Sequence, residues 1–284
     1  MPSYIWLALA STFLIGLADF AYGSAARKGV TAGTMTCSQA SFVLPATAIW
    51  AALEGKYVWT AANYLGAAAA FFIFIGFWAF MRSVSLGEAG VSTPIYRIGF
   101  VVTALVAILF LGEELTVPKA AGFLLAGGAI LLLSEIRFSV AGAVRLKKAS
   151  IAWAMVAMVS VGLVNVVYKL GVAGGVAPSM FLHSQAIFFV WIAFPYAYFA
   201  QGGPRFSRQG WTHSLTSGVS LTVGIISLLA ALQRGEASVV VPISQLSFVV
   251  SVLFATVWMR ERFTARKGLG LLLAAGTVAA FSVA

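Results

Sequence analysis

Long apolar segments separated by short polar connections run along the whole chain. Each is long enough to cross the roughly 30 Å apolar core of a bilayer, which takes about 20 helical residues. The strands of a membrane barrel alternate apolar and polar residues, whereas these segments are continuously apolar, as in Gly122 to Ser134. The pattern therefore predicts an all-α polytopic membrane protein with ten transmembrane helices. They are expected at 4–26, 34–53, 61–81, 89–111, 119–137, 150–172, 178–199, 213–232, 237–258 and 267–283.

The composition excludes an ordinary water-soluble domain. Hydrophobic residues make up 61% of the 284 residues and charged residues only 9%, against about 25% charged residues in a typical soluble domain. The net charge of +10 fits lysines and arginines gathered in cytoplasmic loops beside anionic lipid. The lipid bilayer is therefore the expected partner, and nucleic acid is not. The N-terminal apolar stretch lacks a basic leader and a cleavage site, so it is expected to be retained as the first span.

The two halves of the sequence match each other. A shift of 148 residues aligns 87–134 with 235–282 and gives 20 identities in 48 positions. Shared membrane composition does not explain this match, because Pro, Glu and Lys align as well as Leu, Ala and Val. A shift of 146 residues aligns the earlier spans. The chain is therefore predicted to contain a first five-helix repeat (1–138), a basic connecting loop (139–149) and a second repeat (150–284).

An odd number of spans in each repeat forces the second repeat to sit inverted relative to the first. Inverted repeats are typical of secondary transporters, whose substrate site lies near the bilayer midplane between the repeats. Lysines and arginines in the connections number 13 on one side and 3 on the other, which places both termini outside the cytoplasm. A bacterial inner membrane is the expected location.

The repeated motifs resemble those of the drug/metabolite transporter superfamily, and specifically its EamA type. The resemblance rests on a Gly-Glu-Ala run before a proline-bearing helix and an acidic turn before a glycine-rich helix. The residues are Glu88, Ala89, Pro94, Glu113 and Gly122, and then Glu236, Ala237, Pro242, Glu261 and Gly270. The resemblance implies a ten-helix basket, alternating access and export of amino acids, metabolites or drugs, often driven by protons. Ten-span relatives are usually drawn with both termini in the cytoplasm, which disagrees with the charge count.

Few ionisable residues lie deep in the spans, and each costs roughly 2.5–3.5 kcal/mol to insert, so they are candidates for function. Asp19 lies in the first span and Arg97 near the middle of the fourth. The repeat aligns them with Asn165 and Gln245, which suggests that these positions face one cavity. One interpretation is a structural ion pair. In the other, Arg97 holds a substrate carboxylate or phosphate, and Asp19 holds an ammonium or the coupling proton.

Further polar residues recur in both repeats and extend the same predicted cavity. Hydroxyl and amide groups there either orient a ligand or hydrogen-bond neighbouring helices. Pro94 and Pro242 each lack a backbone donor, which makes them hinge candidates; a static kink is the alternative. Glycine and alanine four residues apart in spans five and ten suit close helix packing, or a homodimer face. The recurring pairs are Ser38 with Ser184, Gln39 with Gln185, and Tyr22 with Tyr168.

These observations predict a secondary transporter that works by alternating access on a small-molecule substrate. The favoured substrates are small amphipathic metabolites such as amino acids, exported with proton coupling or by facilitated transport. Lipid intermediates or nucleotide sugars are the alternative substrates within the same superfamily. An intramembrane enzyme is disfavoured because no zinc motif, Ser/His dyad or aspartate pair is present, and no metal or cofactor is expected. Either a monomer or a homodimer is compatible with the sequence.

Overall fold

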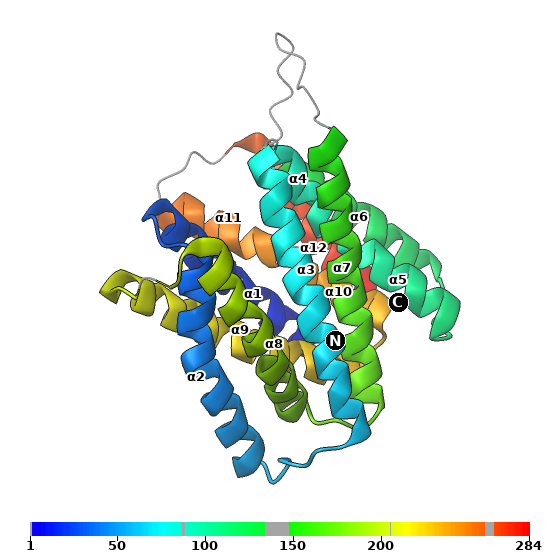
Figure 1. The fold of residues 1–284 in the computed structure, drawn as a ribbon. Coiled ribbons are helices and arrows are strands. Elements are labelled where there is room, and N and C mark those ends of the chain that lie inside the picture. Colours follow the sequence, from blue (N-terminus) through cyan, green and yellow to red (C-terminus); the bar gives the residue numbers. More distant parts are fainter. Residues whose placement is uncertain (1, 87–88, 134–147, 205, 259–263) are drawn as a thin grey trace.

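The computed structural model describes residues 2–86, 89–133, 148–204, 206–258 and 264–284, and these form an all-α bundle (Figure 1). Most helices begin and end within a few residues of the predicted spans. The first repeat contains α1 (Ser3–Arg27), α2 (Ala32–Leu53), the short 3-10 helix η1 (Ala61–Tyr64), α3 (Leu65–Leu86), α4 (Ala89–Arg97), α5 (Gly99–Phe110) and α6 (Val117–Leu133). The second contains α7 (Lys148–Ala173), α8 (Pro178–Gln201), α9 (Arg208–Arg234), α10 (Ala237–Gln245), α11 (Ser247–Trp258) and α12 (Ala265–Ser282).

The fourth and ninth spans are each broken into two helices at equivalent positions. The breaks fall at Ile98 and Leu246, whose backbones have nearly identical angles (φ −72°, ψ 1° and φ −72°, ψ 3°). Each break comes one helical turn after a buried proline, Pro94 or Pro242. In each broken span the first helix ends within the bundle, at Arg97 in α4 and at Gln245 in α10. Both residues therefore lie near the middle of their spans, at mid-depth in the bundle.

Eight helical segments of the described chain are long and apolar enough to cross a membrane, with each broken span counted as one. The shorter α6 packs lengthwise against α12. A Cβ atom on Gly122 would lie 2.7 Å from the Phe281 ring, and one on Gly270 would lie 2.6 Å from Leu133. The small residues of these two spans are therefore used for packing inside the chain. This surface is not free to serve as a homodimer face.

The two repeats interlock into two lobes rather than standing side by side. Helix α7 of the second repeat packs against α3, α4 and α5 of the first, and α1 packs in the same way against α9, α10 and α11. We call these the α7 lobe and the α1 lobe. In Figure 1, α3, α4 and α7 lie to the right of α1, α9 and α11. Each lobe thus combines three elements of one repeat with the first helix of the other.

Matching glycines let the first helix of each repeat approach its partner closely. A Cβ on Gly16 would lie 2.4 Å from the Ser247 carbonyl oxygen, and one on Gly162 would lie 2.7 Å from that of Gly99. The neighbouring hydroxyls also match, because Ser251 donates to the Gly16 carbonyl (2.8 Å) as Thr103 donates to that of Gly162 (2.9 Å). The inverted symmetry read from the sequence is thus repeated in individual contacts.

Replacement of Gly16 by alanine is expected to lower the free energy of unfolding by about 1–3 kcal/mol, because the added methyl overpacks the crossing of α1 and α11. Gly23 on the same helix supplies a matched control, since a Cβ there meets nothing within 4 Å. Gly23→Ala should leave stability unchanged or raise it by up to about 1 kcal/mol through helix propensity. Unfolding of the two purified variants in detergent checks the difference, and equal stabilities would contradict the close crossing of α1 and α11 at Gly16.

The two ends of the bundle carry different charges and different packing. At the basic end, where α1, α3, α6, α8 and α11 finish, the described residues include Arg27, Lys28, Arg82, Arg208 and Arg266. At the far end, where α2, α5, α7 and α9 finish, α10 packs against α5, α6 and α7, and α9 packs against α7. The repeat relates these contacts to those of α4 with α11, α12 and α1, and of α3 with α1, at the basic end. Among the described residues, these helix pairs pack against each other much less extensively. Among the described residues, the lobes are therefore joined more extensively at the far end than at the basic end.

Candidate functional site

An ion pair joins the two lobes at mid-depth. Arg97 closes α4, and its Nη2 atom donates to the Asp19 Oδ2 atom of α1 at 2.7 Å. The same guanidinium donates through Nη1 to the Ser247 hydroxyl, the first residue of α11, at 3.1 Å. Arg97 is the last residue of α4 and Ser247 the first residue of α11, so each lies beside a helix break. The structure thus brings together the two ionisable residues that the sequence singled out.

The ion pair is only partly covered and has unused hydrogen-bonding capacity. The Asp19 side chain is 30% exposed and that of Arg97 15%. The Ser247 hydroxyl also lies 3.4 Å from Asp19 Oδ2, so its contact and that of Arg97 use one carboxylate oxygen. Within the described chain, the buried Nε atom of Arg97 has no hydrogen-bond partner. A guanidinium in this condition retains a donor for a further acceptor, such as a carboxylate.

Aromatic rings flank the guanidinium. The Arg97 Cζ atom lies 5.8 Å from the centre of the Tyr96 ring and 6.0 Å from that of Phe248. Both distances fall within the range of cation–π attraction, which stabilises a cation that has lost part of its water. Tyr96 also packs against Phe80 of α3, with ring centres 4.8 Å apart. The charged groups therefore sit beside an apolar wall, a combination that suits an amphipathic ligand.

A second polar cluster lies one turn from Asp19 toward the basic end. The Tyr22 hydroxyl donates to the Gln39 side-chain oxygen, and the Gln39 amide donates to the Ser217 hydroxyl at 2.6 Å. Tyr22 lies three residues after Asp19, close to the same face of α1. The cluster links α1, α2 and α9, and so ties α2 to the α1 lobe. Tyr22 and Gln39 therefore already satisfy each other without a ligand.

The matching residues of the second repeat are arranged differently. Asn165 donates to the Val161 carbonyl of its own helix at 3.0 Å, and no contact brings it to Gln245 among the described residues. The buried Ser184 hydroxyl donates to the Phe181 carbonyl at 2.7 Å, while Tyr168 packs edge-on against the Phe181 ring. In the described chain the Ser38 hydroxyl and the Gln185 side-chain oxygen are buried without a hydrogen-bond partner. The charged half of the site thus belongs to the first repeat alone.

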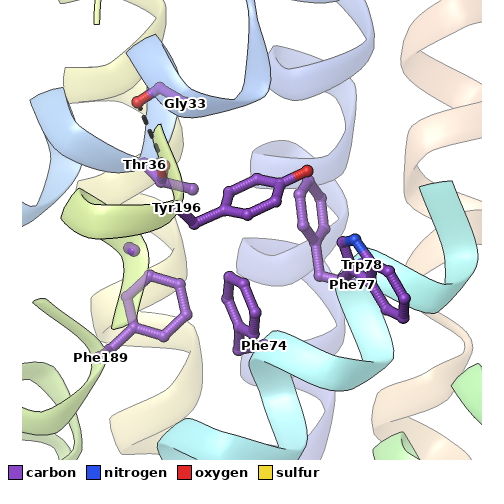
Figure 2. Close-up of a pocket in the computed structure, with 8 residues that line it drawn as sticks. Gly33, Thr36, Phe74, Phe77, Trp78, Phe189 and Tyr196 are labelled. Atoms are coloured by element: carbon purple, nitrogen blue, oxygen red, sulfur yellow. Dashed lines mark hydrogen bonds between the residues drawn. The ribbon is translucent and has the colours of Figure 1, made fainter. Parts of the chain in front are cut away.

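An aromatic hollow lies between α2, α3 and α8 (Figure 2). Phe74 and Tyr196 meet edge to face at 5.3 Å, and Trp78 forms part of the wall. The hollow is lined by Gly33, Thr36, Phe74, Phe77, Trp78, Phe189, Ala193 and Tyr196.

Three charged residues at the far end have a role that the sequence did not reveal. Glu113 is buried and accepts from the backbone N–H groups of Ala237 (2.6 Å) and Ser238 (2.8 Å). Lys119 pairs with Glu236. Lys169 donates to the carbonyls of Leu232 (2.8 Å) and Gly235 (2.7 Å). Glu261, which the repeat aligns with Glu113, lies outside the described residues.

Comparison with known proteins agrees with this architecture. The model of the EamA-like transporter family matches residues 2–135 and 148–283. A solved crystal structure superposes with a TM-score of 0.80 over 99% of this chain and 96% of the other, at 14% sequence identity. At that identity the likeness concerns the fold alone. No curated protein matches the sequence.

Proposed function

Because this chain belongs to the EamA-like transporter family, we propose that it is a secondary transporter that exports small amphipathic metabolites such as amino acids by alternating access. The observation that supports this proposal is the ion pair that joins the two lobes at mid-depth. Arg97 of the α7 lobe contacts Asp19 and Ser247 of the α1 lobe, and both charged side chains are partly exposed. A ligand that binds there touches both lobes, which is what alternating access requires of a substrate site.

In this proposal Arg97 binds the carboxylate of the substrate. Its planar donor fork matches a carboxylate in a bidentate arrangement. Its Nε atom has no partner within the described chain, and its bond to Ser247 is one that a ligand can replace. The rings of Tyr96 and Phe248 cover the apolar part of the ligand beside the charged groups.

Asp19 binds the substrate ammonium or the coupling proton. Its carboxylate is the only acidic group in the first span, and an ionisable group within a span is a candidate for function. A proton and an ammonium compete for the same oxygens, so protonation of Asp19 would release a zwitterionic substrate. Such competition couples export of the substrate to entry of a proton.

The test is efflux from proteoliposomes loaded with a mixed pool of amino acids, with and without an imposed pH gradient. Selective release that depends on the gradient is the expected result and identifies the substrate class. Equal release with and without the gradient would overturn proton coupling and indicate facilitated transport instead. No release of amino acids would overturn the substrate assignment and direct the assay to phosphorylated sugars or lipid intermediates.

A further inference from the structure

The closed far end of the bundle is held by charged residues that all act on the turn between α9 and α10. We propose that Glu113, Lys119 and Lys169 form a latch that keeps the far end closed, and that releasing this latch opens the transporter toward that end. The inference rests on the proposed alternating-access function, and it concerns residues well away from the Asp19–Arg97 pair. This turn, taken with the helix ends on either side of it, comprises residues 232–238.

Glu113 supplies the first contact of the latch. Its two carboxylate oxygens accept separately from the first two N–H groups of α10, which have no acceptor within their own helix. The negative charge also faces the positive end of the helix dipole. Glu113 follows α5 of the α7 lobe, whereas α10 belongs to the α1 lobe. The contact therefore holds the lobes together through a helix end.

Lys119 supplies the second contact, from the start of α6. Its ammonium group is almost fully buried, donates to the Glu114 carbonyl at 2.6 Å and pairs with the Glu236 carboxylate. Glu236 is the residue immediately before α10. A buried ammonium that loses its carboxylate is strongly disfavoured. Separation of α10 from α6 therefore carries a penalty until water reaches Lys119.

Lys169 supplies the third contact and makes the latch asymmetric. Its ammonium group extends from α7 to the carbonyls of Leu232 and Gly235 at the C-terminal end of α9, where a cation is favoured. The repeat aligns Lys169 with Gly23, which has no side chain and faces open space at the basic end. The first repeat therefore cannot form this contact at the basic end. The difference favours closure of the far end over closure of the basic end.

Two single-cysteine reporters follow both ends in a Cys37→Ala background. Ser238→Cys reports on the far end, because this residue is fully buried and its hydroxyl has no hydrogen-bond partner in the described chain. Gly23→Cys reports on the basic end, where its side chain would meet open space. The probe is a membrane-impermeant maleimide applied to either side of proteoliposomes, without substrate. A failure of the latch is thereby distinguishable from a failure of the proposed transport activity.

Lys169→Met and Glu113→Gln should each raise far-end labelling about tenfold or more, since each removes charge-assisted hydrogen bonds. Labelling at Gly23→Cys should fall at the same time, which general loosening of the fold would not produce. Arg234→Met and Glu114→Gln are the matched controls. Within the described chain, Arg234 donates to its own helix and Glu114 is exposed, so neither change should alter labelling. Lys169→Arg should restore protection of the far end.

Unchanged far-end labelling in both Lys169→Met and Glu113→Gln would overturn the latch. Increased labelling at both reporters together would also overturn it, because that result indicates loss of structure rather than a change of state.

Discussion

Replacement of Arg97 by glutamine is expected to reduce transport of carboxylate substrates at least about 30-fold. A bound carboxylate would cover the guanidinium and form a desolvated, hydrogen-bonded charge pair with it. Removing one partner of such a pair costs about 2–5 kcal/mol, and 2 kcal/mol corresponds to this factor. Glutamine keeps one donor group but loses the charge and the planar fork that contacts Asp19 and Ser247. Substrates without a carboxylate should lose much less. Uptake or efflux of matched carboxylate and amide substrates in proteoliposomes measures the difference.

Arg82→Gln provides the control for the loss of one arginine, since Arg82 is exposed at the basic end. It should transport both substrates at the unmodified rate. An equal loss on carboxylate and amide substrates in Arg97→Gln would show that Arg97 supports the fold and does not select the ligand.

Replacement of Asp19 by asparagine is expected to abolish accumulation driven by a pH gradient while exchange of substrate between the two sides continues. Asparagine has nearly the same shape and still accepts from Arg97, but it cannot gain or lose a proton in the transport cycle. The asparagine oxygen can still accept from a substrate ammonium, so the variant should bind substrate, although more weakly, and change state without coupling to protons. Counterflow of labelled substrate measures exchange, and uptake under an imposed gradient measures coupling.

Glu114→Gln, at an exposed carboxylate, should retain gradient-driven accumulation. Normal gradient-driven transport by Asp19→Asn would remove Asp19 from the coupling mechanism. Loss of both exchange and accumulation would instead assign it to substrate binding or to folding.

The transmembrane helices and the inverted repeat could be predicted from the sequence because both leave a periodic or repeated pattern. Eight of the predicted spans have the length and hydropathy of a membrane crossing, and the repeat follows from aligned residues such as Pro94 with Pro242. The helix breaks at Ile98 and Leu246 could not be predicted to the residue. The prolines indicated a local weakening, but each break falls one turn later, next to Arg97 or Ser247 of the ion-pair site.

The pairing of Asp19 with Arg97 could be proposed from their depth and from the neutral residues opposite them in the repeat. Its geometry depends on the interlocked lobes, which bring residues 78 positions apart to 2.7 Å. The role of Glu113 could not be predicted, because a glutamate in a turn usually meets water. Only the fold shows that the first N–H groups of α10 lie beside it.

Transport by the double variant Asp19→Asn/Arg97→Gln, compared with both single variants, distinguishes a substrate site from a structural ion pair. The double change places in the first repeat the neutral residues that the second repeat has at Asn165 and Gln245, and it leaves no buried charge without a partner. A pair that only supports packing would regain transport in the double variant, because the cost of each single change comes from the uncompensated partner. We expect the double variant to fold, yet to transport carboxylate substrates no better than Arg97→Gln. Recovery to near the unmodified rate would contradict the assignment of this ion pair as the substrate site.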